Sequence, residues 1–373
     1  MSSWWLTEEA PPDFGAVEVA QPDVEIVGAG ITGISAALTL AEDGKRVRIH
    51  DARGVADGAS GRNGGFALRG GAMPYDHARK SLGAERAADL WRLTEDRLDR
   101  LAVLGGNAIR RTGSLRLAAD NEERDEIRAE FEALGEDGFE AEWHPDPVRG
   151  RFPAGIFHPG DAATQPARLV RRLALLAAEA GVAIVEHHRV ESLDELEAEH
   201  LLVATDGYPS GLLGQLEGII VPTRGQVIAT EPVTELLFRC PHYARHGFDY
   251  WQQTPEGRII VGGFRDLELE SEFTADELIT PAIQGALDSF VADLVPHQIL
   301  ITHRWAGIFG SVPDLLPVVG RVPGSERAWV AGGYSGHGNV LGFACGDLVA
   351  KAILGDEHPL LGMFDPERLL RRD

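Results

Sequence analysis

The chain has 373 residues, 44% of them apolar and 25% charged, which is enough to bury the core of one large domain or two packed ones. Its formal net charge of −23 disfavours nucleic acid and anionic membranes as partners and favours solubility. Cys240 and Cys345 are far apart, so we expect no disulfide, no metal site and a reducing cytoplasm. The N-terminal segment lacks a signal-peptide pattern, and no apolar run reaches the roughly 18 residues of a membrane span.

The first part of the chain predicts an extension followed by a βαβ unit. Residues 1–20 contain prolines that favour extended backbone, and Trp4 and Trp5 are expected to dock on the body of the protein or on a partner subunit, such as a second copy in a homodimer. Val24–Val27 predicts a buried strand and Ile31–Glu42 a helix with one apolar face. The next strand is predicted at Val47–Ile49.

The middle of the chain continues with helices and strands. We predict one long helix over 78–104, a strand at Ser114–Ala118 and a helix whose capping box is Asp120 with Glu123. A helix with Pro166 in its first turn is expected to run to Ala180. Strands are predicted at Val182–Val185 and Leu201–Ala204.

From Ile219 to Phe264 the pattern changes to short β-branched runs with turns between them, which indicates antiparallel strands and a hairpin over Tyr250–Gly263. Thr274 with Glu277 predicts the cap of another helix, and the last helix is expected from Val340 to Leu354. The fold class is therefore α/β (α+β), a Rossmann-like domain interleaved with a domain built on a mostly antiparallel sheet. The predicted ranges are 21–75, 148–218 and 303–373 for the first domain, and 76–147 and 219–302 for the second.

A glycine motif, Gly28-Ala29-Gly30-Ile31-Thr32-Gly33, lies between the first strand and its helix. In a dinucleotide fingerprint the three glycines allow the tight turn, the approach of a pyrophosphate and the packing of helix on strand. Asp51 ends the second strand, 23 residues after Gly28, where an acid accepts hydrogen bonds from ribose hydroxyls. The alternative is a glycine-rich turn in an unrelated α/β fold.

Two further glycine segments favour FAD over NAD. Gly58–Gly65 is a loop that can set backbone N–H groups and the Arg62 guanidinium against a phosphate or a flavin, where an NAD domain normally continues into a helix. Trp329–Gly338 is a strand with a glycine turn that runs into the last helix, and the N-terminus of that helix stabilises negative charge. The alternatives are a flexible surface loop and a structural turn.

Together these segments resemble the D-amino-acid oxidase superfamily of FAD-dependent oxidoreductases, with its glycine and sarcosine oxidases. The resemblance covers nearly the whole chain and includes Thr112–Leu115, Arg304–Gly307 and Pro313–Gly320. Within the superfamily, Gly58–Gly65 and Gly333–Gly338 are most similar to gamma-glutamylputrescine oxidoreductases. The resemblance implies oxidation of the C–N bond of an amine or amino acid by hydride transfer to flavin N5, hydrolysis of the imine, and oxygen or another electron acceptor.

The chain also departs from parts of the superfamily. Some relatives attach FAD through a histidine in the second segment or a cysteine ahead of the Pro-Asp segment, but Gly58–Gly65 has no histidine and Ile301–Pro313 no cysteine. The resemblance therefore implies non-covalent FAD. Sarcosine-type enzymes use one lysine near the hairpin and another after the His-Gly turn. Here Phe248–Glu270 contains no lysine, and Val340 stands at the second position, which disfavours a sarcosine-like carboxylate site.

Three candidate catalytic residues follow: Arg62, Tyr250 and His337. Arg62 is expected to touch flavin or substrate, or else to make a structural contact; His337 is expected to polarise the flavin, line the pocket or be structural. Because Tyr250 and Trp251 alternate on one strand, only one of them can face the flavin, and we favour Tyr250. The residues expected to bind FAD are Gly28, Gly30, Ile31, Thr32, Gly33, Asp51, Ala52, Arg53, Ala59, Ser60, Arg62, Asn63, Gly64, Gly65, Val190, Ala204, Thr205, Gly333, Tyr334, Gly336, His337, Gly338, Asn339 and Val340.

Three other side chains carry open alternatives. Trp305 and Tyr334 are candidates for an aromatic cage around a cationic amine, or for plain core. Arg69 is a candidate to meet an anionic group, or to form a salt bridge. At the level of function, the favoured reading is oxidation of a small amine. The alternatives are a glycine-oxidase-type amino-acid oxidase or dehydrogenase, and a flavin-binding subunit without its own turnover.

Overall fold

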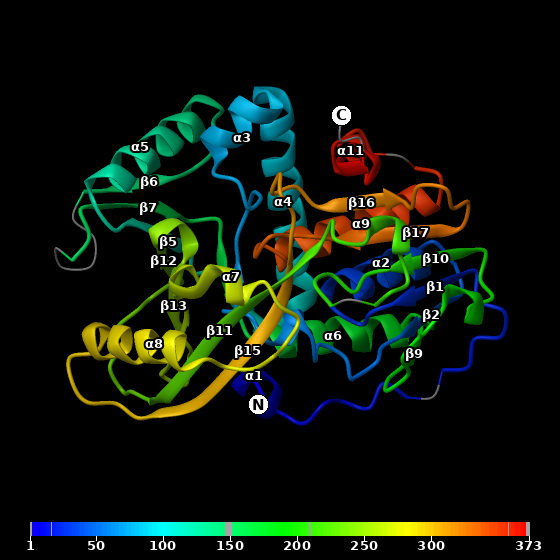
Figure 1. Cartoon of the computed structure of the whole chain (residues 1–373), viewed down its shortest axis with the longest axis horizontal. Helices are drawn as coiled ribbons and strands as arrows, with labels where there is room; N and C mark the ends of the chain where they lie inside the picture. The colour runs from blue at the N-terminus through cyan, green and yellow to red at the C-terminus, as the bar shows by residue number, and fades with distance from the viewer. Residues whose placement is uncertain (1, 16, 146–150, 209, 357, 371–373) are drawn as a thin grey trace.

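The computed structural model describes residues 2–15, 17–145, 151–208, 210–356 and 358–370, and the predicted domain boundary at 147/148 lies outside them. The strands form three sheets, of six, eight and three strands. In Figure 1 the six-stranded sheet lies to the right, and the long strands of the eight-stranded sheet run toward the lower left. Helix α4 (Ala84–Gly105) stands between the two regions.

The six-stranded sheet is built around β1, whose four residues are all buried, as expected for a strand inside a parallel sheet. Its pairs are parallel except for β16 with β17. In spatial order the strands are β16 (Val318–Arg321), β17 (Ala328–Gly332), β10 (His200–Val203), β1 (Val24–Val27), β2 (Val47–His50) and β9 (Ala183–Val185).

Three helices pack together beside this sheet, namely α2 (Ile31–Glu42), α6 (Pro166–Glu179) and α9 (Val340–Ile353). Their shared core is apolar, but one buried carboxylate fixes α4 against them. Asp347 on α9 is fully buried, accepts a hydrogen bond from Thr39 at 2.9 Å and pairs with Arg97 of α4 at 2.6 Å. A buried carboxylate is tolerated only when it is paired in this way, so the contact fixes the register of the helices.

The eight-stranded sheet is antiparallel apart from the parallel pair of β12 with β5. In spatial order the strands are β15 (Ile301–Ser311), β11 (Val221–Pro232), β14 (Arg258–Gly263), β13 (Asp249–Gln253), β12 (His242–Ala244), β5 (Ser114–Ala118), β7 (Ala154–His158) and β6 (Glu142–His144). Helix α8 (Pro281–Leu294) packs on β11 and β14, and α5 (Asn121–Glu136) packs on β5 and β7.

The remaining elements are short or lie between the sheets. The three-stranded sheet contains β3 (Phe66–Ala67), β8 (Ala162–Thr164) and β4 (Ile109–Arg110). The other helices are α1 (Trp4–Thr7), α3 (Tyr75–Leu82), α7 (Leu269–Glu272), α10 (Leu361–Phe364) and α11 (Glu367–Leu370). Across the described ranges, no helix combines the length and apolar character that a bilayer crossing requires.

The expected α/β (α+β) class is confirmed, because a mostly parallel sheet with helices adjoins a mostly antiparallel one. The domain ranges stay a proposal. Two strands from ranges that we assigned to the first domain, β7 in 148–218 and most of β15 in 303–373, pair within the eight-stranded sheet. The chain therefore crosses between the sheets at β7 and at β15.

Two predicted helices were wrong in their bounds. The single helix over 78–104 is two helices, α3 and α4, because Gly83 between them adopts φ +88°, which an α-helix cannot contain. The helix expected to start at Thr274 is α8, which starts at Pro281. Thr274 Oγ1 accepts from the Asp276 N–H at 3.1 Å in a local turn, and Pro281 presets the first helical residue.

Candidate active site

The first glycine segment connects β1 to α2 as the motif predicts. Gly28 adopts φ +113°, and a Cβ there would lie 2.6 Å from the Ala204 carbonyl oxygen, so the turn requires glycine. Asp51 at the end of β2 fixes this turn, because its carboxylate accepts hydrogen bonds from the Ala29 N–H at 2.7 Å and the Arg53 N–H at 2.8 Å. Burial raises the pKa of Asp51, and these two hydrogen bonds oppose that shift.

Two buried tryptophan side chains donate hydrogen bonds to the backbone of the second glycine segment. Trp5 Nε1 donates to the Asn63 carbonyl and Trp305 Nε1 to the Arg62 carbonyl, each at 2.8 Å. Trp5 is 1% exposed and Trp305 is fully buried. Gln252 on β13 adds hydrogen bonds to the Gly64 carbonyl at 2.6 Å and the Gly65 carbonyl at 2.8 Å. The N-terminal segment thus docks on the body of the protein and supports this loop.

The third segment follows β17 and ends at α9. Asp206, after β10, accepts hydrogen bonds from the Gly333 N–H at 2.7 Å and the Gly310 N–H at 2.9 Å. The Tyr334 hydroxyl lies 2.9 Å from Thr32 Oγ1 on α2. Asp206 therefore fixes the start of the third segment, and Tyr334 joins that segment to the first.

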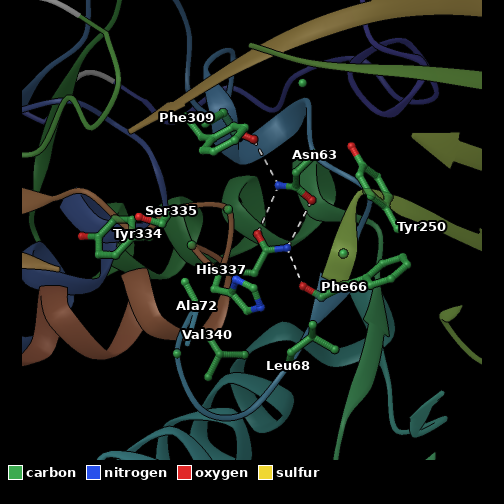
Figure 2. Close-up of a pocket in the computed structure, with 18 of the residues that line it drawn as sticks. Asn63, Phe66, Leu68, Ala72, Tyr250, Phe309, Tyr334, Ser335, His337 and Val340 are labelled. Carbon is green, nitrogen blue, oxygen red and sulfur yellow. Dashed lines mark hydrogen bonds between the residues drawn. The ribbon is translucent and has the colours of Figure 1, made fainter. Parts of the chain in front are cut away.

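The second and third segments also contact each other directly. The side chains of Asn63 and Asn339 exchange two hydrogen bonds of 3.1 Å, and Asn339 donates a further one to the Phe66 carbonyl at 2.7 Å. Asn63 also accepts from the Gly65 N–H at 2.8 Å. All three glycine segments are therefore fixed around one space, and Figure 2 labels Asn63 from the second segment and Tyr334, Ser335 and His337 from the third.

That space is a cavity of about 540 Å³. Residues of the glycine segments line it, and strands of the eight-stranded sheet supply Gly263 as well as Tyr250 and Phe309, of which Figure 2 labels the two aromatic residues. The residues predicted to bind FAD that line it are Gly30, Ile31, Thr32, Ala59, Ser60, Arg62, Asn63, Gly64, Ala204, Tyr334, Gly336, His337, Gly338, Asn339 and Val340. The other predicted FAD residues, all of them described, lie outside the lining: Gly28, Gly33, Asp51, Ala52, Arg53, Gly65, Val190, Thr205 and Gly333.

All three candidate catalytic residues line this cavity, but their surroundings differ. Arg62 is held by structural contacts: Nε donates to the Asp57 carbonyl at 2.8 Å, and the guanidinium pairs with Glu277 at 3.4 Å. Tyr250 faces the cavity, whereas its neighbour Trp251 is fully buried in the core of the second sheet. Strand alternation thus separates these two aromatic side chains.

Tyr250 and His337 are both neutral near pH 7. Burial raises the pKa of Tyr250 to about 12, with the Arg265 charge opposing it. Burial lowers the pKa of His337 to about 4, although a hydrogen bond with the Ser335 backbone opposes that shift. His337 Nδ1 is buried and has no hydrogen-bond partner among the described residues.

The structure also decides between the alternative roles predicted for Trp305 and for Arg69. Trp305 lies under the Arg62 carbonyl and outside the cavity lining, so it cannot form a cage with Tyr334, which does line the cavity. Arg69 forms the salt bridge that we considered, with Asp161 at 3.0 Å and with Glu95 at 2.5 Å. Its side chain is nevertheless part of the cavity lining.

Several lining residues were missed by the sequence reasoning. Tyr243, Arg116, His158, Arg265 and Phe309 all come from the eight-stranded sheet or directly follow one of its strands. Tyr243 is opposite both Tyr250 and Arg116 in strand register, which places the three in one row across the sheet. Alternation within each strand could have indicated the inward residues, but the pairing of β12 with β5 joins segments over 100 residues apart and could not be read locally.

The residues present fit FAD. A side chain at position 30 would crowd Ser60, because a Cβ there would lie 3.0 Å from Ser60 Oγ. Because Gly30 has no side chain, a pyrophosphate can approach the N-terminus of α2. Each Asp51 oxygen accepts one N–H and retains acceptor capacity for a ribose hydroxyl. His337 also lines this cavity.

Comparison with known proteins supports the same assignment. The probable oxidoreductase OrdL of Haemophilus influenzae is 26% identical over 92% of this chain and 85% of its own length. Gamma-glutamylputrescine oxidoreductase of Escherichia coli is 26% identical over 90% and 84%, and glycine oxidase of Geobacillus kaustophilus 25% identical over 89% and 92%. The crystal structure of L-proline dehydrogenase from P. horikoshii has the same fold, with a TM-score of 0.78, 20% identity, and coverage of 95% of this chain and 99% of that one.

The family described as FAD dependent oxidoreductase (DAO) matches residues 23–352, which is most of the chain. The resemblance drawn from the glycine segments is confirmed by this match and by the relatives. FAD as the cofactor is confirmed in the same way. The chain therefore belongs to the DAO family of FAD-dependent oxidoreductases, the family of amine and amino-acid oxidoreductases to which its curated relatives belong.

Proposed function

We propose that this enzyme oxidises the C–N bond of a small primary or secondary amine and that the imine product then hydrolyses in water. The observation that supports the proposal is the shared cavity, which residues of the three glycine segments line together with Tyr250 and Phe309 of the antiparallel sheet. Two relatives, gamma-glutamylputrescine oxidoreductase and glycine oxidase, are named for substrates that contain an amine. When bound, FAD supplies the acceptor of the hydride, and the chain supplies binding, orientation and exclusion of water.

The predicted FAD residues outside and inside the lining have different proposed roles. Asp51 binds ribose hydroxyls, and the N-terminus of α2 at Gly30 and Ile31 binds the pyrophosphate. The Gly58–Gly65 and Gly333–Val340 segments hold the flavin end. We propose non-covalent binding, because the positions at which relatives form a bond contain neither a histidine nor a cysteine in this chain.

Tyr250 and His337 are proposed to orient the substrate amine. A neutral phenol and a neutral imidazole accept hydrogen bonds from an N–H without adding charge, which favours the unprotonated amine that the reaction requires. Tyr250 has no hydrogen-bond partner among the described residues, so its hydroxyl is available to the substrate. Arg62 is proposed to act as a positioning residue, because its guanidinium fixes the loop by donating to the Asp57 carbonyl and pairing with Glu277.

We also propose an electron acceptor and a cellular compartment for the enzyme. The electron acceptor after the flavin is oxygen or another oxidant. Cys240 and Cys345 are free and buried, which is compatible with a reducing cytoplasm.

The test is anaerobic mixing of the purified holoenzyme with a panel of primary amines, secondary amines and amino acids, followed by admission of air. Bleaching of the flavin absorbance by members of the panel is expected, and recovery in air distinguishes an oxidase from a dehydrogenase. A flavin that only dithionite reduces would contradict the proposal and favour a flavin-binding subunit without its own turnover.

A further inference from the structure

Three exposed side chains border the opening of the cavity. Most of the lining residues are buried or half-buried; Tyr334, for example, is 4% exposed. The lining residues with exposed side chains, among a lining that is described throughout, are His77, His246 and Leu315. The two histidine side chains are 57% and 54% exposed, and Leu315 is 39% exposed. Gly336 is exposed as well but has no side chain.

The three side chains come from three separate elements. His77 lies on α3, His246 in the turn between β12 and β13, and Leu315 in the loop between β15 and β16. Each imidazole lies near a carboxylate, with His246 Nε2 2.6 Å from Glu126 and His77 Nε2 3.7 Å from Asp76. Leu315 is therefore the apolar member of the three, and its side chain has a different kind of role to explain.

Leu315 also has a backbone conformation that leucine rarely adopts. Its φ is +59°, in the left-handed region, where glycine or asparagine is preferred over a bulky side chain. An exposed leucine alone is ordinary. Here, however, the exposed leucine lines the cavity in a conformation that glycine would adopt at lower cost, and such residues cluster at functional sites. The turn does not require leucine, so the side chain itself is what serves the cavity.

The loop that carries Leu315 is fixed by the C-terminal segment. Arg368 on α11 forms a bidentate pair with Asp314, with Nε 2.8 Å from Oδ2 and Nη2 3.2 Å from Oδ1. Arg368 Nη2 also donates to the Leu316 carbonyl at 2.8 Å. Within the loop, the Leu315 N–H donates to the Val312 carbonyl at 3.1 Å. Both neighbours of Leu315 are thus held by one guanidinium, which keeps the leucine at the opening.

Leu315 narrows the opening toward α3 and α4. Met73 and Trp91 line the main cavity, and together with Leu315 they also border a second, smaller space. Side chains that enclose a small space lie close together, so the loop between β15 and β16 approaches the two helices at this point (Figure 1). A molecule that enters the cavity here has to pass the leucine side chain.

We propose that Leu315 is a specificity-determining residue, whose side chain narrows the entrance of the cavity and admits slender amines in preference to branched ones. This inference rests on the proposed function, because the molecules that pass are its amine substrates, and it narrows their shape. An apolar side chain at the entrance also suits contact with the alkyl part of an amine. Arg368 is a positioning residue in this proposal, because it acts by holding Asp314 and Leu316.

The first test compares two amines that differ only in bulk away from the reacting carbon. These are butylamine and neohexylamine, which has the same chain with two additional methyl groups on its third carbon. Anaerobic rapid mixing with the holoenzyme gives the efficiency of flavin reduction by each amine. The ratio of the branched to the unbranched amine should rise by about 10-fold in Leu315→Gly and in Leu315→Ala, and should fall by about 10-fold in Leu315→Phe.

The glycine and alanine variants separate the side chain from the backbone. Both remove the bulk of Leu315, but only glycine relieves the left-handed conformation. Equal ratios in the two variants are expected, since the proposal assigns the effect to bulk. A ratio that rises in Leu315→Gly and stays at the wild-type value in Leu315→Ala would assign the effect to the backbone and overturn the proposal.

Arg368 and an exposed leucine elsewhere complete this test. Arg368→Gln should raise the ratio by about 3-fold, and Arg368→Lys should raise it less, because the lysine keeps the charge that holds Asp314. Added to Leu315→Gly, Arg368→Gln should have no further effect, since it acts through the leucine. Leu300→Ala, at a position that is 64% exposed and outside the cavity lining, is the matched control and should keep the wild-type ratio.

The second test needs no turnover. Acrylamide, a small neutral quencher, is titrated into the oxidised holoenzyme, and the loss of flavin fluorescence reports how freely it reaches the flavin. Leu315→Gly should raise the quenching constant at least about 2-fold, and Leu315→Phe should lower it, because the side chain controls access from solvent. The FAD content should be the same in all variants.

The two proposals fail in different ways. A ratio that neither Leu315→Gly nor Leu315→Phe changes, or that both change in the same direction, overturns the role of Leu315 and leaves the proposed function in place. If no amine reduces the flavin, the proposed function fails, and acrylamide still decides the role of Leu315. A quenching constant that is equal in wild type and Leu315→Gly then overturns it. If Leu315→Phe does not fold, the glycine and alanine variants decide.

Discussion

The carboxamides of Asn63 and Asn339 exchange two hydrogen bonds of 3.1 Å, although 276 residues separate them in the chain. This pair closes the cavity between the second and third glycine segments. Because Asn63 also orders Gly65 and Asn339 also holds Phe66, either side chain affects the loop as a whole. We therefore expect the loss of this pair to affect the cofactor site more than the stability of the core.

Replacing Asn63 with alanine should weaken FAD binding by about 10-fold to 100-fold, because each lost hydrogen bond to a part-buried group contributes about 1 kcal/mol. Asn339→Ala should have a similar effect, and the double variant should be no worse than about the larger single effect. FAD titration of the apoprotein by fluorescence quenching measures this. Asn107→Ala, at an exposed position, is the control. Wild-type affinity in both single variants would show that the pair does not order the site.

The cofactor should leave the protein on denaturation. Acid precipitation of the holoenzyme is expected to release all of the FAD into the supernatant, and the mass of the precipitated chain should equal that of the sequence alone. Flavin absorbance that stays in the pellet would contradict the non-covalent proposal.

Tyr250→Phe should lower kcat/KM for the amine substrate by about 10-fold to 100-fold, because the variant keeps the ring but removes the hydroxyl that orients the amine. The flavin spectrum and FAD content should not change. Tyr75→Phe, which removes a hydroxyl bonded to Asp137 at 2.6 Å outside the cavity, is the matched control for kcat/KM. Equal kcat/KM in wild type and Tyr250→Phe would remove Tyr250 from the site.

The pH dependence of kcat/KM should follow the substrate rather than the enzyme. With the pKa of His337 at about 4 and that of Tyr250 at about 12, both stay neutral from about pH 5 to about pH 10. The rate should rise with pH as the substrate ammonium loses its proton. Two substrates whose ammonium pKa values differ by about one unit should give midpoints that differ equally. A midpoint that is the same for both would indicate a titrating group of the protein.

Stability should decline in mild acid because of His242. This side chain is 6% exposed, lies 2.7 Å from the Cys240 carbonyl, and has a pKa lowered to about 4 by burial. Its folded pKa is below the unfolded value of about 6.5, so the unfolded state takes up the proton first as pH falls. The resulting loss in the free energy of unfolding builds up as the pH falls from about 6.5 to about 4 and reaches about 3 kcal/mol.

His242→Gln should therefore flatten the dependence of Tm on pH in this window relative to wild type, while lowering Tm at pH 7. His77→Gln removes a histidine that is 57% exposed and should leave the slope unchanged. Parallel slopes for wild type and His242→Gln would contradict the assigned burial of this imidazole.

Much of the fold followed from local patterns. The bounds of β1 and α2 match their predictions because the strand's apolar run, the glycine turn and the helix periodicity agree there. The helix bounds at Gly83 and Thr274 were wrong where local signals competed: periodicity continued through Gly83, and Thr274 with Glu277 imitated a capping box. In the structure Glu277 instead pairs with Arg53 at 2.8 Å and accepts from the Tyr208 hydroxyl at 2.6 Å.

The substrate side of the site could not be predicted in the same way. Among the described residues, Asp266 pairs with Arg245 and Glu272 with Arg224, so neither carboxylate pairs with the cavity-lining Arg265; tertiary structure alone decides these pairings. The pairing of Asn63 with Asn339 likewise depends on the packing of two segments from opposite ends of the chain. Sequence motifs predicted the cofactor because each motif is one continuous stretch of backbone, whereas the side chains that the antiparallel sheet contributes to the cavity come from separate strands.

Anaerobic rapid mixing with an α-deuterated amine tests the central claim most directly. If the enzyme transfers hydride from the substrate carbon to FAD, an amine substrate should bleach the flavin, and deuterium on the carbon that bears the nitrogen should slow that bleaching several-fold. A flavin that no amine bleaches, or bleaching at the same rate with the deuterated substrate under conditions where reduction itself is observed, would contradict the account.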